Sequence, residues 1–345
     1  MKTKQLVYLA PNALRKTGHD EVYLHCVKSA CKNANLEFCA FLPEETELKI
    51  TPSLHKYFPL TKKYHFFSYT KLFNRFSQKN AVFFIEHISI KDLCHIVFAT
   101  ILSWKKASIF LLMRRDYSTS ALKEFFLVNL LKLLQVSSKL TLLTDSSLIF
   151  HYFQEKKLPP KTVMPIPHIP QVAPQITPRT KIRAWWPGPP REAKGKQLIE
   201  SLAKKLPNDH FELLLSEECG IENATHLPKH LPRKKYEETL ASIDAVLLPY
   251  DPVVYRSGTS GILVEAVCAG KMPFVRSGSW LAFEVESNNL SELILDWNSD
   301  SIIDEIIQKI NSNEIQSKLQ KMKDVYQSFH TRENFNQILQ SSFAR

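Results

Sequence analysis

The sequence predicts an α/β protein of two Rossmann-like domains that face each other across a cleft. Three observations lead to this fold class. The chain has 345 residues, which is too long for one ordinary core. Apolar stretches of strand length alternate with stretches of helical periodicity. A proline-rich segment at 158–178 divides this alternation in two.

The predicted first domain covers residues 1–168. Its expected strands are the apolar segments 5–10, 81–85, 108–113 and 140–144. A helix is predicted over 21–33, because Val22, Cys26 and Ala30 share one helical face. The order strand, loop, helix at the start of the chain is typical of a mainly parallel sheet.

The proline-rich segment is expected to be a linker, because neither a helix nor a central strand tolerates so many prolines. The second domain is predicted over 169–328. Its expected strands are 181–186, 211–215, 245–249 and 272–275, and its expected helices are 195–206, 234–243 and 261–269. Helical periodicity dominates 301–345, and we expect a final helix at 329–345 to pack back on the first domain.

The ends and the cysteines exclude several classes of protein. The first residues hold only a short apolar stretch between lysines and a polar run, unlike a signal peptide, so a cytoplasmic protein is expected. The most apolar segments are shorter than the roughly 20 residues that cross a bilayer. The six cysteines form no CxxC pair. Reduced thiols are therefore expected, with no disulfide and no metal site.

The net charge of +11 lies entirely in the N-terminal half. Residues 1–170 carry 24 Lys and Arg against 12 Asp and Glu, whereas 171–345 carry 21 against 22. The segment 48–85 holds seven basic and no acidic residues, interleaved with aromatics. An anionic membrane surface and a solvated face over core aromatics fit this segment equally. Nucleic acid fits it less well.

The segment 245–270 has the features of a phosphate site. An apolar strand leads into a loop with Ser257, Thr259, Ser260 and Gly261, and a helix then begins with Glu265 one turn inside it. Small residues at a helix start leave backbone N–H groups free, and with the helix dipole these attract a phosphate. The alternative is an ordinary helix start capped by Ser and Thr.

A second loop of this kind precedes it. The segment 186–195, WPGPPREAKG, leads from a strand into a helix and carries Arg191 and Lys194 beside glycines. Cations there can clamp a diphosphate and stabilise the charge that develops as it leaves. The segment has the spacing of neither an ATPase P-loop nor a dinucleotide fingerprint. The alternative is a solvated basic pair.

Together the two loops resemble the retaining glycosyltransferases of the GT-B fold, a group that includes the family-four-like enzymes of bacterial cell-envelope glycan assembly. The resemblance covers 180–285 and follows the order and spacing of that family. It implies that Arg191 and Lys194 bind the donor diphosphate and assist its departure. It also implies that Thr259, Ser260 and Gly261 hold the phosphates and the sugar. Glu265 matches the glutamate that binds the ribose.

The chain departs from the family pattern at two positions. Ser257 stands where the family has a first glutamate that contacts the donor sugar, which leaves the sugar and the retaining course open. Pro189 stands where the family has its first basic residue, and Arg191 follows two positions later.

The resemblance also implies roles in the first domain. Gly18 in the loop after the first strand is expected near the donor phosphates, and His19 beside it near the acceptor. His87 follows a later strand and is expected near the reacting sugar as a catalytic residue. A further group is expected on the acceptor side: Arg114, Arg115 and Asp116. The alternatives are surface or satisfied polar histidines and a loop ion pair of little consequence.

These inferences predict a glycosyltransferase without metal or other cofactor, which moves a sugar from a nucleoside diphosphate sugar to an acceptor. The basic first domain favours a glycan or glycolipid acceptor, such as a lipopolysaccharide intermediate, and a peripheral position on the inner face of the membrane. No nucleic-acid partner is expected. The alternatives are a sugar-nucleotide epimerase of the same fold and a non-catalytic module that binds membrane or nucleic acid. The nucleotide base, the sugar and the oligomeric state stay open.

Overall fold

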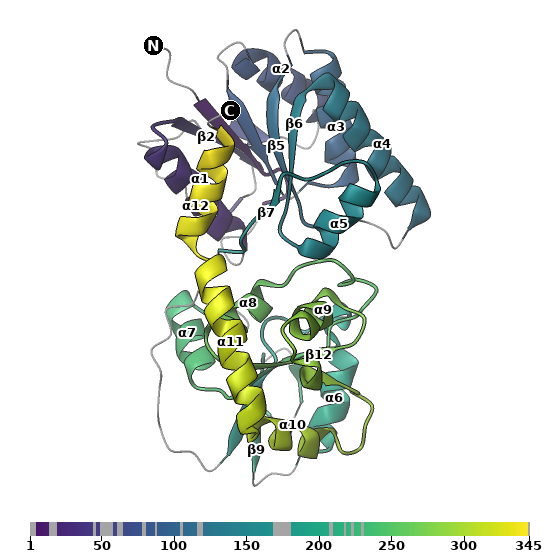
Figure 1. Cartoon of the computed structure of the whole chain (residues 1–345), viewed down its shortest axis with the longest axis vertical. Helices are drawn as coiled ribbons and strands as arrows, with labels where there is room; N and C mark the ends of the chain where they lie inside the picture. The colour runs from purple at the N-terminus through teal and green to yellow at the C-terminus, as the bar shows by residue number, and fades with distance from the viewer. Residues whose placement is uncertain are drawn as a thin grey trace. The chain divides into compact units, whose positions relative to one another are not determined.

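The structure is a computed structural model of the whole chain (Figure 1). It describes residues 5–13, 19–43, 46–48, 58–60, 65–77, 81–86, 88–103, 106–115, 120–167, 181–206, 210–216, 219–221, 224–228 and 231–343. The chain divides into two compact units. Unit 1 comprises Met1–Pro167 with Arg332–Arg345, and unit 2 comprises His168–Thr331.

Unit 1 is built on a parallel sheet. Its described strands are β1 (Gln5–Leu9), β2 (Glu37–Pro43), β3 (Phe58–Leu60), β4 (Val82–Ile85), β5 (Ser108–Met113), β6 (Lys139–Thr144) and β7 (Thr162–Val163). They pair in the order β3-β2-β1-β4-β5-β6-β7, and each printed register is parallel. β1 is central and buried along its whole length, which fits its continuous apolar sequence.

Helices cover both faces of this sheet. They are α1 (His19–Asn33), α2 (His65–Ser77), α3 (Ile90–Ile101), α4 (Ala121–Ser137), α5 (Ser147–Glu155) and α12 (Arg332–Phe343). Alternate strand residues point to opposite faces. Val7 and Leu9 therefore join a core cluster with residues of α2 to α5, whereas Leu6 and Tyr8 join one with α1 and α12.

The end of the chain packs on α1. Phe335 of α12 is fully buried and meets the Tyr23 ring edge-on at 5.6 Å between centroids. Asn336 Nδ2 donates a hydrogen bond to Ser29 Oγ at 3.1 Å. Figure 1 shows α12, in yellow, beside α1, in purple. The last helix is thus part of the first unit, although it follows the second in the sequence.

Unit 2 has a parallel sheet of its own. Its described strands are β8 (Ile182–Trp185), β9 (Phe211–Ser216), β10 (Thr225–Leu227), β11 (Ala245–Leu248), β12 (Met272–Arg276) and β13 (Ile294–Leu295). They pair in the order β10-β9-β8-β11-β12-β13. The α-helices of this unit are α6 (Lys196–Lys204), α7 (Arg233–Ala241), α8 (Gly261–Cys268), α9 (Trp280–Ser287), α10 (Ile302–Ile310) and α11 (Asn313–Phe329).

Both sheets have the doubly wound Rossmann topology. In each, the first strand of the unit is internal, the next two extend the sheet to one side, and the fourth pairs with the first on the other side. The predicted class, α/β with two Rossmann-like domains, is confirmed. In such sheets ligands bind at the carboxyl ends of the strands where the order reverses. That point lies between β1 and β4 in unit 1 and between β8 and β11 in unit 2.

The structure corrects the predicted linker. Residues up to Pro167 belong to unit 1, with Met164 and Ile166 fully buried. β7 adds a short edge strand beside β6, and an edge strand tolerates neighbouring prolines. Residues 168–180 lie outside the described part of the chain. Five described strands were not predicted: β3, β7, β10 and β13, which have only two or three residues each, and β2, which has seven.

The basic segment 48–85 contributes aromatics to the core. Tyr69, Phe73 and Phe76 of α2 are buried and pack in the cluster beneath α2 to α5. Lys71 and Arg75 on the same helix are exposed. For these five residues the structure agrees with a solvated face over core aromatics. No helix in the described ranges is long and apolar enough to span a bilayer.

Candidate functional site

Two loops of unit 2 meet where its strand order reverses. The 186–195 loop follows β8, and the 249–260 loop follows β11, which pairs with β8. Asp251 N donates a hydrogen bond to the Ala193 carbonyl at 3.0 Å and joins the two loops. The sequence predicted both loops as phosphate sites, and the structure brings them together.

Gly195 permits this approach. Its φ of +80° is left-handed, a conformation that L side chains rarely adopt. A Cβ atom at this position would lie 2.2 Å from the Pro249 carbonyl oxygen. Gly195 therefore serves two needs at once: the turn into α6 and the backbone contact between the loops.

Lys194 extends its ammonium group into this junction. The residue is 9% exposed, and its own carbonyl accepts a hydrogen bond from Trp186 Nε1 at 3.1 Å, which fixes its backbone. Its Nζ lies 3.5 Å from the Pro187 carbonyl oxygen and 5.5 Å from the centre of the Tyr250 ring. Within the described residues it makes no ion pair with a carboxylate.

Burial, and then the charge of Arg191, lower the pKa of Lys194 to about 8. A buried ammonium is costly unless it is paired. Arg191 is exposed and directly precedes the short 3-10 turn Glu192–Lys194. Two cations beside each other, one of them buried, make a site that favours an anion.

The start of α8 lies in the same region. Ser260 caps the helix, and its Oγ accepts a hydrogen bond from Leu263 N at 3.4 Å. Burial raises the pKa of Tyr250, and its hydroxyl is buried without a hydrogen-bond partner among the described residues. Tyr250 thus places its ring beside the Lys194 ammonium and leaves a buried hydroxyl unpaired in the 249–260 loop. Gly261 is the first residue of the helix, and Thr259 precedes the cap.

Glu265 lies one turn inside α8 and is 4% exposed. Arg233 Nη1 donates to its Oε1 at 2.5 Å, and the Tyr236 hydroxyl donates to its Oε2 at 2.7 Å. Burial, and then Glu265, raise the pKa of Tyr236 well above its usual value. The Tyr236 ring packs on Trp185 at 4.9 Å between centroids. The carboxylate is therefore held in one orientation.

Sequence reasoning missed Arg233, Tyr236 and Tyr250 as site residues. Tyr250 follows directly after the apolar strand β11, and that position at the carboxyl end of a central strand was a usable signal. Arg233 and Tyr236 stand 32 and 29 positions before Glu265. No local pattern links them to it.

In unit 1 the structure commits Arg114 to an internal contact. Its Nε donates to Asp145 Oδ2 at 2.9 Å, and the Asp145 side chain has no exposed surface. The guanidinium also lies 4.9 Å from the centre of the Tyr23 ring. Arg115 is exposed. The acceptor role assigned to these two arginines stays a prediction, and for Arg114 the ion pair is an additional, structural role.

Four predicted residues of unit 1 cannot be placed in this way. Gly18, His87 and Asp116 lie outside the described residues, as does the side chain of His19, which begins α1. Glu86, next to His87 in the sequence, is 2% exposed and accepts a hydrogen bond from the Tyr8 hydroxyl. Glu86 N also donates to the Leu9 carbonyl at 3.1 Å, between β4 and β1. The described residues contain no cluster of three His, Cys, Asp or Glu side chains suited to a metal ion.

Comparison by sequence finds no match, either among protein-family profiles or among curated proteins. Solved structures do match. A glycosyltransferase from Rickettsia africae has a TM-score of 0.71 and 11% identity, with 99% of this chain and 98% of that one covered. Anabaena HepE in complex with UDP-glucose has a TM-score of 0.67 and 12% identity, with 99% of each chain covered. A UDP-N-acetylglucosamine 2-epimerase homologue from Listeria monocytogenes has a TM-score of 0.60 and 12% identity, with 94% of this chain and 93% of that one covered.

This chain shares the GT-B fold of these proteins. At such identities the likeness concerns the fold, and it extends over nearly the whole length of each chain. The same fold serves the epimerase homologue. Function must therefore be argued from the site.

Proposed function

We propose that the protein transfers a sugar from a nucleoside diphosphate sugar to an acceptor, and that the two loops of unit 2 hold the donor. One observation carries the proposal. Lys194 is a buried ammonium with no carboxylate partner among the described residues, and the buried hydroxyl of Tyr250, whose ring lies 5.5 Å from its Nζ, has no hydrogen-bond partner there either. A diphosphate would supply the missing negative charge and accept from the backbone N–H groups of the helix start.

The same groups would assist the chemistry. As the bond between the sugar and the diphosphate breaks, negative charge develops on the departing phosphate. Lys194, Arg191 and the helix start at Gly261 would stabilise it. The departing phosphate would take the proton of the acceptor hydroxyl, so no protein nucleophile and no metal ion enters the proposal. Thr259 and Ser260 would face the phosphates, and the resemblance also assigns Gly18 to the phosphates and His87 to the reacting sugar.

The retaining course and a family-four-like assignment are parts of this proposal. They rest on the resemblance of 180–285 and on the position of Glu265, whose carboxylate is held by Arg233 and Tyr236 as a ribose-binding group would need to be. Ser257, in place of the family's first glutamate, is 6% exposed. A serine cannot offer the charge of a carboxylate to the sugar, so a different sugar contact is expected here.

We further propose an acceptor on the membrane, such as a lipid-linked cell-envelope glycan, and a peripheral position of the protein. The excess positive charge of residues 1–170 supports this. An epimerase is the second candidate, because the Listeria homologue shares the fold. Incubation with a nucleotide sugar separates the two. Transfer releases a nucleoside diphosphate in proportion to product, whereas epimerisation yields a new nucleotide sugar.

The proposal predicts selective binding of nucleoside diphosphates. We expect one or more of UDP, GDP, ADP, CDP and dTDP to bind the wild-type protein, and the matching monophosphate to bind at least tenfold more weakly. A charge-assisted hydrogen bond contributes about 1.5–3 kcal/mol, and the monophosphate lacks the phosphate that Lys194 and Arg191 would contact. Isothermal titration calorimetry measures both. Equal affinity for the two nucleotides, or no binding of any of them, would remove the donor site.

The site also predicts a dependence of affinity on pH. In the free protein the pKa of Lys194 is about 8, and a bound diphosphate would raise it. Binding above pH 8 must then take up a proton, so affinity should fall as pH rises and be about tenfold lower at pH 9 than at pH 7. Lys194→Arg, whose guanidinium stays charged, should lose this dependence. An identical pH profile in both proteins would contradict the role of Lys194.

A further inference from the structure

Unit 1 exposes an unusual amount of apolar surface on two neighbouring helices. The described chain has eleven large hydrophobic side chains that are exposed, and eight of them lie on α3, on α4 or at the end of α3. They are Phe98, Ile101, Leu102, Leu122, Phe125, Phe126, Leu133 and Val136, which are 48–72% exposed. Single exposed hydrophobics are ordinary, but a contiguous group marks an interaction surface.

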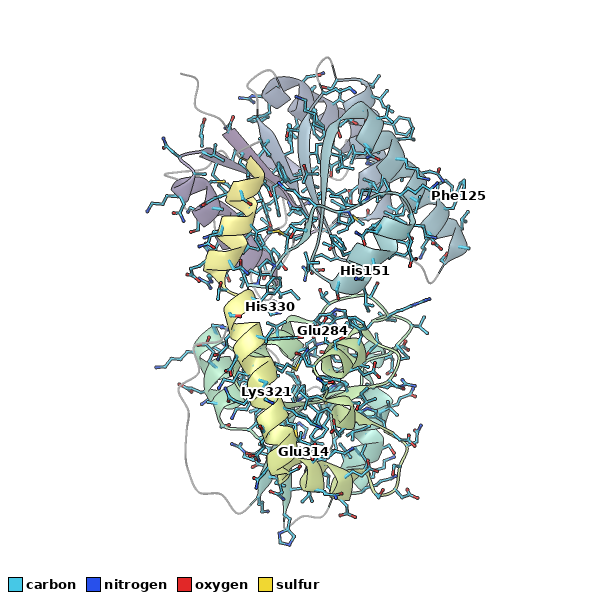
Figure 2. All side chains as sticks on the ribbon, in the orientation of Figure 1. Phe125, His151, Glu284, Glu314, Lys321 and His330 are labelled. Atoms are coloured by element: carbon cyan, nitrogen blue, oxygen red, sulfur yellow. The ribbon has the colours of Figure 1, made fainter. Side chains whose placement is uncertain are left out.

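Helical spacing places the residues of α4 on one stripe. Leu122, Phe126, Leu133 and Val136 recur at intervals of three, four and seven, and Phe125 lies beside them. The opposite face of the helix is also apolar: Leu127, Leu131 and Leu134 are fully buried in the core of unit 1. Figure 2 shows Phe125 on the outer side of unit 1. The core therefore does not account for the outer stripe.

The exposed residues of α3 and α4 form one surface. The two helices lie side by side (Figure 1), and Thr100 Oγ1 and Ser137 Oγ share a hydrogen bond of 2.8 Å at their C-terminal ends. Ile101 follows Thr100, and Val136 precedes Ser137, so the two apolar stripes approach each other there. We call this surface the α3–α4 face.

Exposed lysines lie on α3 and α4 and next to their ends, and few acidic residues accompany them there. The exposed ones are Lys91, Lys106, Lys123, Lys132 and Lys139. In residues 88–115 and 120–139 the structure describes two acidic residues. Asp92 is buried and caps α3, and Glu124 pairs with Lys156 at 2.6 Å.

We propose that the α3–α4 face docks on a bilayer that contains anionic lipid. Its apolar stripe would enter the boundary between headgroups and acyl chains, and its lysines would contact the anionic headgroups. A second copy of the chain fits less well. In a two-fold dimer the same face meets itself, so lysine would oppose lysine, and like charges in an interface are unfavourable.

This inference deepens the proposed function, since it assigns the surface that would bring the protein to a lipid-linked acceptor. It can nevertheless be tested without sugar transfer. The face lies in unit 1 and shares no residue with the donor loops of unit 2. Vesicle binding and nucleotide binding are therefore separate measurements, and either can fail while the other holds.

The test is sedimentation with vesicles of phosphatidylcholine, with and without phosphatidylglycerol. At about 0.1 M salt we expect the wild-type protein to bind the anionic vesicles. We expect Phe125→Ser/Leu133→Ser to bind them at least tenfold more weakly, and Lys123→Gln/Lys132→Gln roughly tenfold more weakly. At about 1 M salt the Debye length falls from ≈ 10 Å to 3 Å, and the contribution of the lysines should largely disappear.

The matched control is Lys234→Gln/Lys321→Gln, which removes two exposed lysines of unit 2 and should bind as the wild type does. Nucleotide affinity and thermal stability should be unchanged in all variants, because the substituted side chains are exposed. Wild-type binding in the apolar variant, or an equal loss in the control, would overturn the proposal. So would a wild-type dimer that the apolar variant converts to monomer without any vesicle binding, which would assign the face to self-association.

Discussion

Lys194→Met is expected to raise the thermal stability of the nucleotide-free protein and to abolish its stabilisation by a nucleoside diphosphate. We expect an increase in Tm of about 2–6 °C without ligand and a loss of diphosphate affinity of about 10- to 100-fold. Differential scanning calorimetry with and without the nucleotide, and calorimetric titration, measure the two effects. Without ligand Lys194→Met should have the higher Tm, and with saturating nucleotide the wild type should have the higher Tm.

The reason is the cost of the buried charge. Burial and Arg191 hold the pKa of Lys194 at about 8, below its value of 10.5 in the unfolded chain. The unfolded state therefore binds the proton more tightly, and the penalty to stability is fully present below pH 8 and disappears as pH rises towards 10.5. Its size is roughly 3 kcal/mol. Met removes this penalty with similar volume, and loses about 1 kcal/mol of attraction to the Tyr250 ring.

Lys196→Met is the matched control. Lys196 is two positions away, its side chain is 35% exposed, and it pairs with Glu200 at 3.6 Å. Its replacement should change Tm by less than about 2 °C and leave nucleotide affinity within threefold of the wild type. Destabilisation by Lys194→Met would mean that Lys194 is a structural group. Unchanged affinity would contradict its assignment to the donor site.

Gly195→Ala is expected to destabilise unit 2 by about 3 kcal/mol or more. The left-handed φ of this residue costs any L side chain roughly 1–2 kcal/mol, and the new Cβ would meet the Pro249 carbonyl oxygen at 2.2 Å, which forces the two loops apart. The diphosphate site should weaken as well, because Lys194 directly precedes the displaced residue. Urea unfolding followed by tryptophan fluorescence reports mainly on this unit, since Trp185, Trp186, Trp280 and Trp297 belong to it and only Trp104 belongs to unit 1.

Gly220→Ala separates the cost of the left-handed φ from the cost of the clash between the loops. Gly220 also has a positive φ, +63°, but a Cβ there would meet nothing within 4 Å. The free energy of unfolding of this variant should fall only by the cost of the left-handed φ, about 1 kcal/mol. The variant should bind nucleotide as the wild type does. Equal losses of stability in the two variants would show that the contact between the 186–195 and 249–260 loops contributes little.

The sequence by itself determined the strands and helices that position the site. β8, β11 and β12 are short apolar runs, and α6 and α8 begin where glycine and small residues interrupt the pattern. Such signals are local, so they can be read without knowledge of the fold. The two Rossmann-like domains and the loops that carry Lys194 and Glu265 followed from them. The edge strands were missed, because a run of two or three residues has no period to detect.

Only the tertiary structure decided which side chains the site residues contact. Arg233 and Tyr236 reach Glu265 because α7 and α8 pack in one unit, and Tyr250 reaches Lys194 because β11 pairs with β8. The same holds for the α3–α4 face. The sequence shows α4 as apolar on both sides, and only packing decides that Leu127, Leu131 and Leu134 turn inward while Phe125 and Leu133 stay exposed. Periodicity specifies which residues share a face, whereas burial depends on neighbours distant in the chain.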